Sequence, residues 1–141
     1  MYFFLFPFSA RRAAPGRNSL RQAPMQPTNP NLPRVIDDCH ELLKWLIPVL
    51  DKFPRARRFT LGERLESGLL AVLEECIDAA YSKHKQPQLQ AANRRLSSVR
   101  HLWRLAYELR VIPQNRYFYG SERLVDIGTQ IGAWQKSRAT G

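Results

Sequence analysis

Three arginines in one short segment are the residues whose type and spacing most clearly suggest chemistry. Arg55, Arg57 and Arg58 lie in the run FPRARRFTLGERLE, which covers residues 53–66. A guanidinium group carries a permanent charge and a planar set of donors that matches the oxygens of a phosphate or a carboxylate. Core packing does not require charge at these positions. The sequence therefore predicts that they contact phosphate or an acidic protein surface.

A second basic set lies further along the chain, in a segment with few acids. Glu108 is the only acidic residue between positions 87 and 113, whereas Arg94, Arg100 and Arg104 all lie there. Arginines without acidic partners on a rigid helix suit phosphate contacts. Aromatic residues are not interleaved with this set at the spacing of stacked bases, so we predict phosphate contact and no base-specific readout.

The remaining polar residues do not form a recognisable catalytic or metal-binding pattern. His40, His84 and His101 are far apart in the sequence, and none has a partner at metal-ligand spacing. The chain has no glycine-rich phosphate loop and no nucleophile elbow. Cys39 and Cys76 fall at apolar helical positions, which predicts free, buried thiols that act as small hydrophobic side chains. We therefore expect a protein that is not an enzyme and needs no metal or cofactor.

Composition narrows the class of partner. The chain has 141 residues, of which 44% are hydrophobic, and 22 Lys and Arg against 12 Asp and Glu give a net charge of +10. This balance favours polyanionic partners, either nucleic acid or an acidic protein surface. No apolar run approaches the length of a membrane span. Two free thiols fit a reducing cytoplasm.

Apolar residues recur every three to four positions from residue 34 onward, which indicates helices and no strands. We predict an all-α fold, an antiparallel up-down four-helix bundle with helices at about 34–53, 61–84, 87–110 and 114–138. Thr60 and Glu63 match a capping box, which would start the second helix at residue 61. Pro48 should kink the first helix or split off its last turn.

The predicted helices carry more apolar residues than one core stripe needs. On the third helix the extra set is Leu102, Leu105 and Leu109. Similar sets occur on the first helix (Ile36, Leu43, Ile47 and Leu50) and on the second (Leu70, Leu73, Ile77 and Tyr81). They indicate either a wide core or a subunit interface, and we favour an interface because monomers rarely expose contiguous apolar stripes.

Three glycines interrupt the fourth predicted helix at positions 120, 128 and 132. Glycine lowers helix propensity, so a reason for it is expected. We predict that Gly120, Gly128 and Gly132 allow neighbouring helices to approach closely, with Trp134 packed beside Gly132.

Residues 1–33 differ from the rest of the chain. An apolar, aromatic start is followed by a stretch rich in proline and arginine. The basic residues follow the apolar block instead of preceding it, which argues against a signal peptide. We expect a poorly ordered extension over 1–33 and a four-helix domain over 34–141. Met25 offers an alternative start of translation.

Two separated motifs resemble one known family. The run FPRARRFTLGERLE, the second helix ending in Ala79-Ala80-Tyr81, and VDIGTQIGAWQKS at 125–137 are similar to the accessory variability determinant (Avd) proteins of diversity-generating retroelements. The resemblance covers about residues 34–138. The four-helix-bundle proteins encoded in ribosomal RNA intervening sequences are the neighbouring family. Their second helix typically carries a motif like Asn-Ile-Ala-Glu-Gly, from which Leu73-Glu74-Glu75-Cys76-Ile77 departs.

The resemblance implies a fold, an assembly and a set of partners. Avd proteins form barrel-shaped homopentamers of four-helix bundles, have no catalysis of their own, and bind a reverse transcriptase and nucleic acid through a basic surface. They support mutagenic synthesis of cDNA from a template RNA. The alternative, of the intervening-sequence type, is a structural or protein-interaction module. A reverse-transcriptase gene with a template and variable repeat nearby would distinguish the two.

Overall fold

The computed structural model describes residues 31–140 of the chain, with side chains up to residue 138. Four long helices make up this part: α2 (Arg34–Asp51), α4 (Glu63–Tyr81), α5 (Gln86–Glu108) and α6 (Gln114–Thr140). The short α3 (Arg55–Arg57) and the π-helix η3 (Arg58–Gly62) lead into α4 without a break. Residues 31–140 contain no strand, so the predicted all-α class is confirmed for them. The extension predicted over 1–33 lies outside the described residues except for its last three positions.

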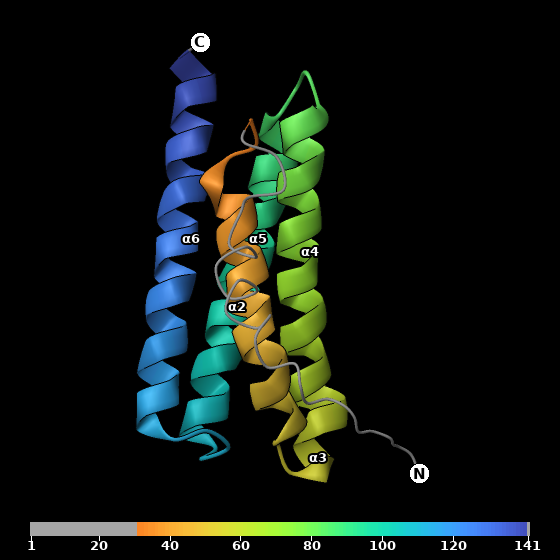
Figure 1. The fold of residues 1–141 in the computed structure, drawn as a ribbon, viewed down its shortest axis with the longest axis vertical. Helices are drawn as coiled ribbons and strands as arrows, with labels where there is room; N and C mark the ends of the chain where they lie inside the picture. The colour runs from red at the N-terminus through yellow and green to blue at the C-terminus, as the bar shows by residue number, and fades with distance from the viewer. Residues whose placement is uncertain (1–30, 141) are drawn as a thin grey trace, which may run out of the picture. The chain divides into compact units, whose positions relative to one another are not determined.

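The four helices are arranged in a closed ring in which each packs against two others. α2 contacts α4 and α6, and α5 contacts the same two helices from the opposite corner. Successive helices run in opposite directions, joined at alternate ends of the bundle (Figure 1). This is the predicted antiparallel up-down bundle. None of the helices within residues 31–140 combines the length and the apolar character that crossing a membrane requires.

Trp103 on α5 is the largest fully buried side chain, at 1% exposure. Its indole N–H donates to the Tyr117 carbonyl of α6 at 3.0 Å, so burial leaves no unpaired donor. Trp45 of α2 meets its ring edge-on with the ring centroids 6.0 Å apart. Trp103 therefore joins three helices. Buried apolar residues of all four long helices form one core cluster that includes Trp103, and Tyr117 and Trp134 pack against it while partly buried.

The extra apolar set of the first helix belongs to the core of the single chain. Ile36, Leu43 and Leu50 are each less than 7% exposed, and Ile47 packs partly against them. The interface interpretation was therefore wrong for this helix, which uses a wide apolar arc. On α4 the set divides, because Leu73 is buried whereas Leu70 and Tyr81 are exposed.

The second long helix does not begin with a capping box. Helical structure runs continuously from Arg55, and the Thr60 hydroxyl donates back to the carbonyls of Ala56 and Arg57, at 3.3 and 3.4 Å. Gly62, which the prediction placed inside a first turn, ends a π-helix instead. The prediction was wrong because a threonine hydroxyl that can cap a helix can also bond to the carbonyl four residues earlier.

Two helix ends also differ from the prediction. α2 continues through Pro48 to Asp51, so its last turn is not split off. α4 ends at Tyr81, three residues early, and the Lys85 ammonium donates to the carbonyls of Ala79 and Ser82 at 2.7 and 2.6 Å. These bonds satisfy the acceptors that a helix end leaves free.

Two of the three glycines on α6 allow close helix contact as predicted. A Cβ on Gly120 would lie 2.7 Å from the Trp103 ring, and one on Gly128 would lie 3.2 Å from Leu96. Gly132 was predicted wrongly, since nothing lies within 4 Å of a Cβ built there. Close contact at Gly68 of α4, 2.7 Å from Val99, was not predicted.

Cys39 and Cys76 are free and buried, as the sequence predicts. A hydrogen bond to Cys76, together with burial, raises the pKa of the Cys39 thiol. A protonated, buried thiol is a poor nucleophile and a poor metal ligand. The burial of both thiols supports a packing role for the pair.

Candidate nucleic-acid interface

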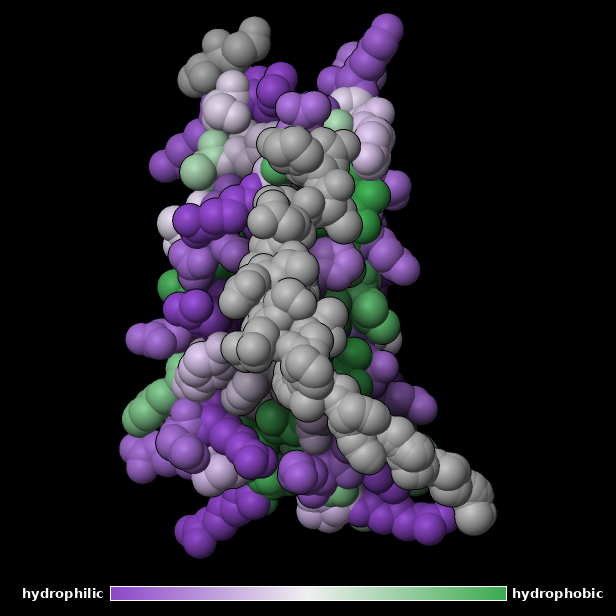
Figure 2. All heavy atoms as spheres, viewed as in Figure 1, coloured by the Kyte–Doolittle hydropathy of each residue, from purple (hydrophilic) through white to green (hydrophobic). Residues whose placement is uncertain are grey.

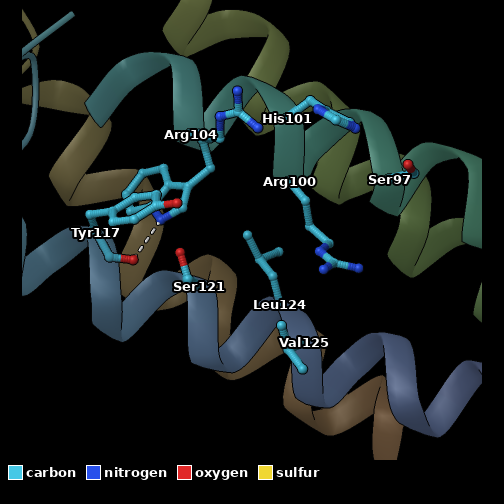
Figure 3. Close-up of a pocket in the computed structure, with 9 residues that line it drawn as sticks. Ser97, Arg100, His101, Arg104, Tyr117, Ser121, Leu124 and Val125 are labelled. Carbon is cyan, nitrogen blue, oxygen red and sulfur yellow. Dashed lines mark hydrogen bonds between the residues drawn. The ribbon is translucent and has the colours of Figure 1, made fainter. Parts of the chain in front are cut away.

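A groove of about 300 Å³ lies between α5 and α6 and contains two of the predicted arginines. Figure 3 shows Arg100 extending from α5 toward α6, whereas the Arg104 side chain stays beside α5; both residues line the groove. Both arginine side chains are exposed. The full lining is Ser97, Arg100, His101, Trp103, Arg104, Tyr117, Ser121, Leu124 and Val125.

Helical spacing explains how this lining is assembled. On α5, Ser97, Arg100 or His101, and Arg104 are three or four residues apart and so share one face. On α6, Ser121 and Val125 are related in the same way. The buried Trp103 ring and its hydrogen bond to Tyr117 fix the distance between the two helices at this level.

The chemistry of the groove suits an anion. Two guanidinium groups, an imidazole and the hydroxyls of Ser97 and Ser121 can all donate hydrogen bonds, and none of the lining residues is acidic. Hydrogen bonds from charged donors to phosphate oxygens are about twice as strong as neutral ones. The groove can therefore hold a phosphate or a carboxylate between α5 and α6.

The structure modifies the prediction that these arginines lack acidic partners. Arg104 forms an ion pair with Glu108 at 3.0 Å, although both side chains are more than half exposed, so the pair contributes little stability. Arg94 lies outside the lining of the groove. Within the described residues, neither Arg94 nor Arg100 forms an ion pair.

The first arginine set occupies a separate place, at the junction of α2 and α4. Arg55 and Arg57 are exposed, and Arg58 is half-buried because its guanidinium donates to the Asp51 carbonyl at 3.1 Å. That bond satisfies a carbonyl at the end of α2. No ion pair involves these three arginines within residues 31–138. None of them lines the groove, so the structure does not join the two predicted sets into one site.

Sequence reasoning missed an exposed aromatic surface on α6. Phe118, Tyr119 and Val125 are 54%, 45% and 48% exposed, and they line a shallow hollow with Ser121 and Glu122. Ser121 and Val125 also line the basic groove, so the two surfaces are continuous. The signal in the sequence was the run Tyr117-Phe118-Tyr119, of which only the first residue fits the core stripe.

The predicted interface residues on α5 are exposed to different degrees. Leu105 and Leu109 are 41% and 48% exposed, whereas Leu102 packs partly against the core. On the face shown in Figure 2, hydrophilic side chains cover much of the visible surface, with smaller hydrophobic areas between them. An assembly through Leu102, Leu105 and Leu109 stays a prediction.

The described residues contain no group of three His, Cys, Asp or Glu side chains that could hold a metal ion. The candidate site therefore consists of basic and aromatic side chains on helix surfaces, without a coordinating cluster in this part of the chain.

Comparison with known protein families gives one match. A family model described as bAvd-like matches residues 35–138, which is almost the whole of the part of the chain that the structure describes. No curated protein matches the sequence.

Proposed function

The chain belongs to the bAvd-like family, and we propose that it is a non-catalytic accessory protein of a diversity-generating retroelement. In this role it binds the reverse transcriptase of the element, together with the template RNA or its cDNA, and supports mutagenic reverse transcription. The single observation that carries the proposal is the family match across all four helices. The same match favours this function over the intervening-sequence type of bundle.

The basic groove supports the nucleic-acid part of the proposal. A net charge of +10 attracts the chain to polyanions over a distance, and the groove is lined by hydrogen-bond donors from both α5 and α6. Contacts of this kind hold phosphates without reading the bases. We propose that Arg94, Arg100 and Arg104, with Arg55, Arg57 and Arg58, contact phosphate or an acidic face of the transcriptase.

The exposed apolar residues support the proposed binding to other protein chains. Leu105 and Leu109 on α5 and Phe118 on α6 present apolar side chains to solvent in the single chain. Burying such residues against another protein is favourable. We propose that Leu102, Leu105 and Leu109 join copies of the chain into a homo-oligomer, a pentamer by analogy with the family.

Co-purification with the transcriptase tests the proposed function. The full chain, carrying an affinity tag, is coexpressed with the reverse transcriptase of the proposed retroelement. We expect the transcriptase to be retained at low salt and to elute as the salt concentration rises, because charged contacts are screened. Light scattering on the eluted complex then gives the number of copies. A transcriptase that passes through the column at low salt would contradict the proposal.

A further inference from the structure

Phe59 is an exposed aromatic ring at the centre of the first arginine set. It lies in the π-helix η3, between α3 and α4, and 57% of its surface is exposed. Single π-helical turns occur frequently at functional sites. No other aromatic ring packs on Phe59 within the described residues, which distinguishes it from Tyr119, whose ring lies 4.7 Å from that of Trp45.

Two guanidinium groups lie close to the Phe59 ring. The central carbon of Arg58 is 5.3 Å from the ring centroid, and that of Arg55 is 6.0 Å from it. These distances are within the range of a cation–π contact. Arg58 is held in addition by its hydrogen bond to the Asp51 carbonyl, so its position does not have to be ordered when a ligand binds.

The exposed Phe59 ring with guanidinium groups beside it suits an unpaired nucleobase better than a protein surface. The arginines alone could recognise an acidic protein surface, whereas the exposed ring adds a flat face on which a base can stack. Proteins that bind single strands combine basic side chains along the backbone with aromatic rings on which bases stack. Bases can also stack on guanidinium planes. Bases in a duplex are already stacked on each other, so such a ring selects single strands.

We propose that Phe59 is a stacking platform for one unpaired base of a single-stranded nucleic acid, with Arg55, Arg57 and Arg58 on the neighbouring phosphates. The inference rests on the proposed function, because it assumes that the chain binds nucleic acid. It adds the class of ligand, a single strand with an accessible base, and a site separate from the α5–α6 groove. It agrees with the sequence-based expectation of no base-specific readout, because an aromatic ring can stack on any base.

Binding of the full chain to three RNA probes tests the platform. The probes are a short labelled oligouridine, an RNA duplex of equal length, and an oligomer of the same length without bases. We expect Phe59→Ala to weaken binding of oligouridine about tenfold or more, since one base stack is lost. Binding to the duplex and to the baseless oligomer should be unchanged. The salt dependence for oligouridine should also be unchanged, because no phosphate contact is removed.

Two further variants make the result specific. Phe59→Trp keeps an aromatic face and should retain the affinity for oligouridine. Tyr81→Ala removes an exposed ring at the end of α4, outside both arginine sets, and should leave that affinity unchanged. Oligouridine binding by Phe59→Ala that equals the wild type, or an equal loss on all three probes, would overturn the platform alone. A wild-type chain that binds none of the probes would overturn nucleic-acid binding itself, and the platform with it.

Discussion

Replacing Arg94, Arg100 and Arg104 by glutamine should weaken binding of single-stranded RNA about 100-fold at about 0.1 M salt. Each phosphate neutralised on a single strand contributes about −0.7 to the slope of log affinity against log salt, so three lost contacts make the slope shallower by about 2. Glutamine is a fair helix former, and all three side chains are exposed, so α5 should stay intact. A salt titration of RNA affinity by fluorescence anisotropy measures both quantities.

A second triple variant distinguishes the loss of specific contacts from the loss of net positive charge. Replacing Lys44, Lys83 and Arg138 by glutamine also removes three positive charges from exposed positions. This variant should keep most of its affinity, because those residues lie outside both arginine sets. Equal losses in the two variants would show that only the total charge of the protein matters. Unchanged binding by the first variant would assign Arg94, Arg100 and Arg104 to a solvated surface.

Replacing Trp103 by alanine should lower the free energy of unfolding by about 3–5 kcal/mol, the range for removing a large buried aromatic side chain. Trp103 is 1% exposed and joins α5 to Tyr117 of α6 and to Trp45 of α2. It also forms part of the basic groove, so binding at Arg100 and Arg104 should weaken with it. Urea denaturation followed by circular dichroism measures the change.

Alanine substitutions at Gly120, which faces the Trp103 ring, and at Gly132, which faces no neighbour, test the close approach of the two helices. Gly120→Ala places a methyl group 2.7 Å from the Trp103 ring and should destabilise the chain by about 1–3 kcal/mol. Gly132→Ala meets no neighbour and should be neutral or stabilising, by up to about 1 kcal/mol. In a Trp103→Phe background the cost at Gly120 should fall, because the clashing atoms belong to the indole. An equal cost at Gly120 and Gly132 would show that the two helices do not approach closely there.

The sequence predicted the helices well because their apolar periodicity is strong over many turns. Three of the four predicted starts, at residues 34, 87 and 114, lie within one residue of the observed ones. The start of the second helix was wrong because Thr60 bonds back to earlier carbonyls, and the local residues allow either arrangement. Phe53 and Leu61, on either side of this segment, are buried, and local sequence does not specify such tertiary packing.

The surface was harder to predict than the core. The extra apolar sets on the first and third helices look alike in sequence, yet Leu43 and Leu50 are buried whereas Leu105 and Leu109 are exposed. The difference depends on which side of each helix faces a neighbour in the ring. The groove could not be predicted as a unit either, since Arg100 and Ser121 come together only through the pairing of α5 and α6.

Synthesis of cDNA in a reconstituted reaction tests the central claim most directly. Purified reverse transcriptase and its template RNA are incubated with nucleotides, without the chain, with the wild-type chain, and with a variant that has six arginines replaced by glutamine: Arg55, Arg57, Arg58, Arg94, Arg100 and Arg104. An accessory protein that acts through its basic surface should raise the yield of cDNA several-fold, and the variant should not. An equal yield in all three reactions would contradict the proposed function.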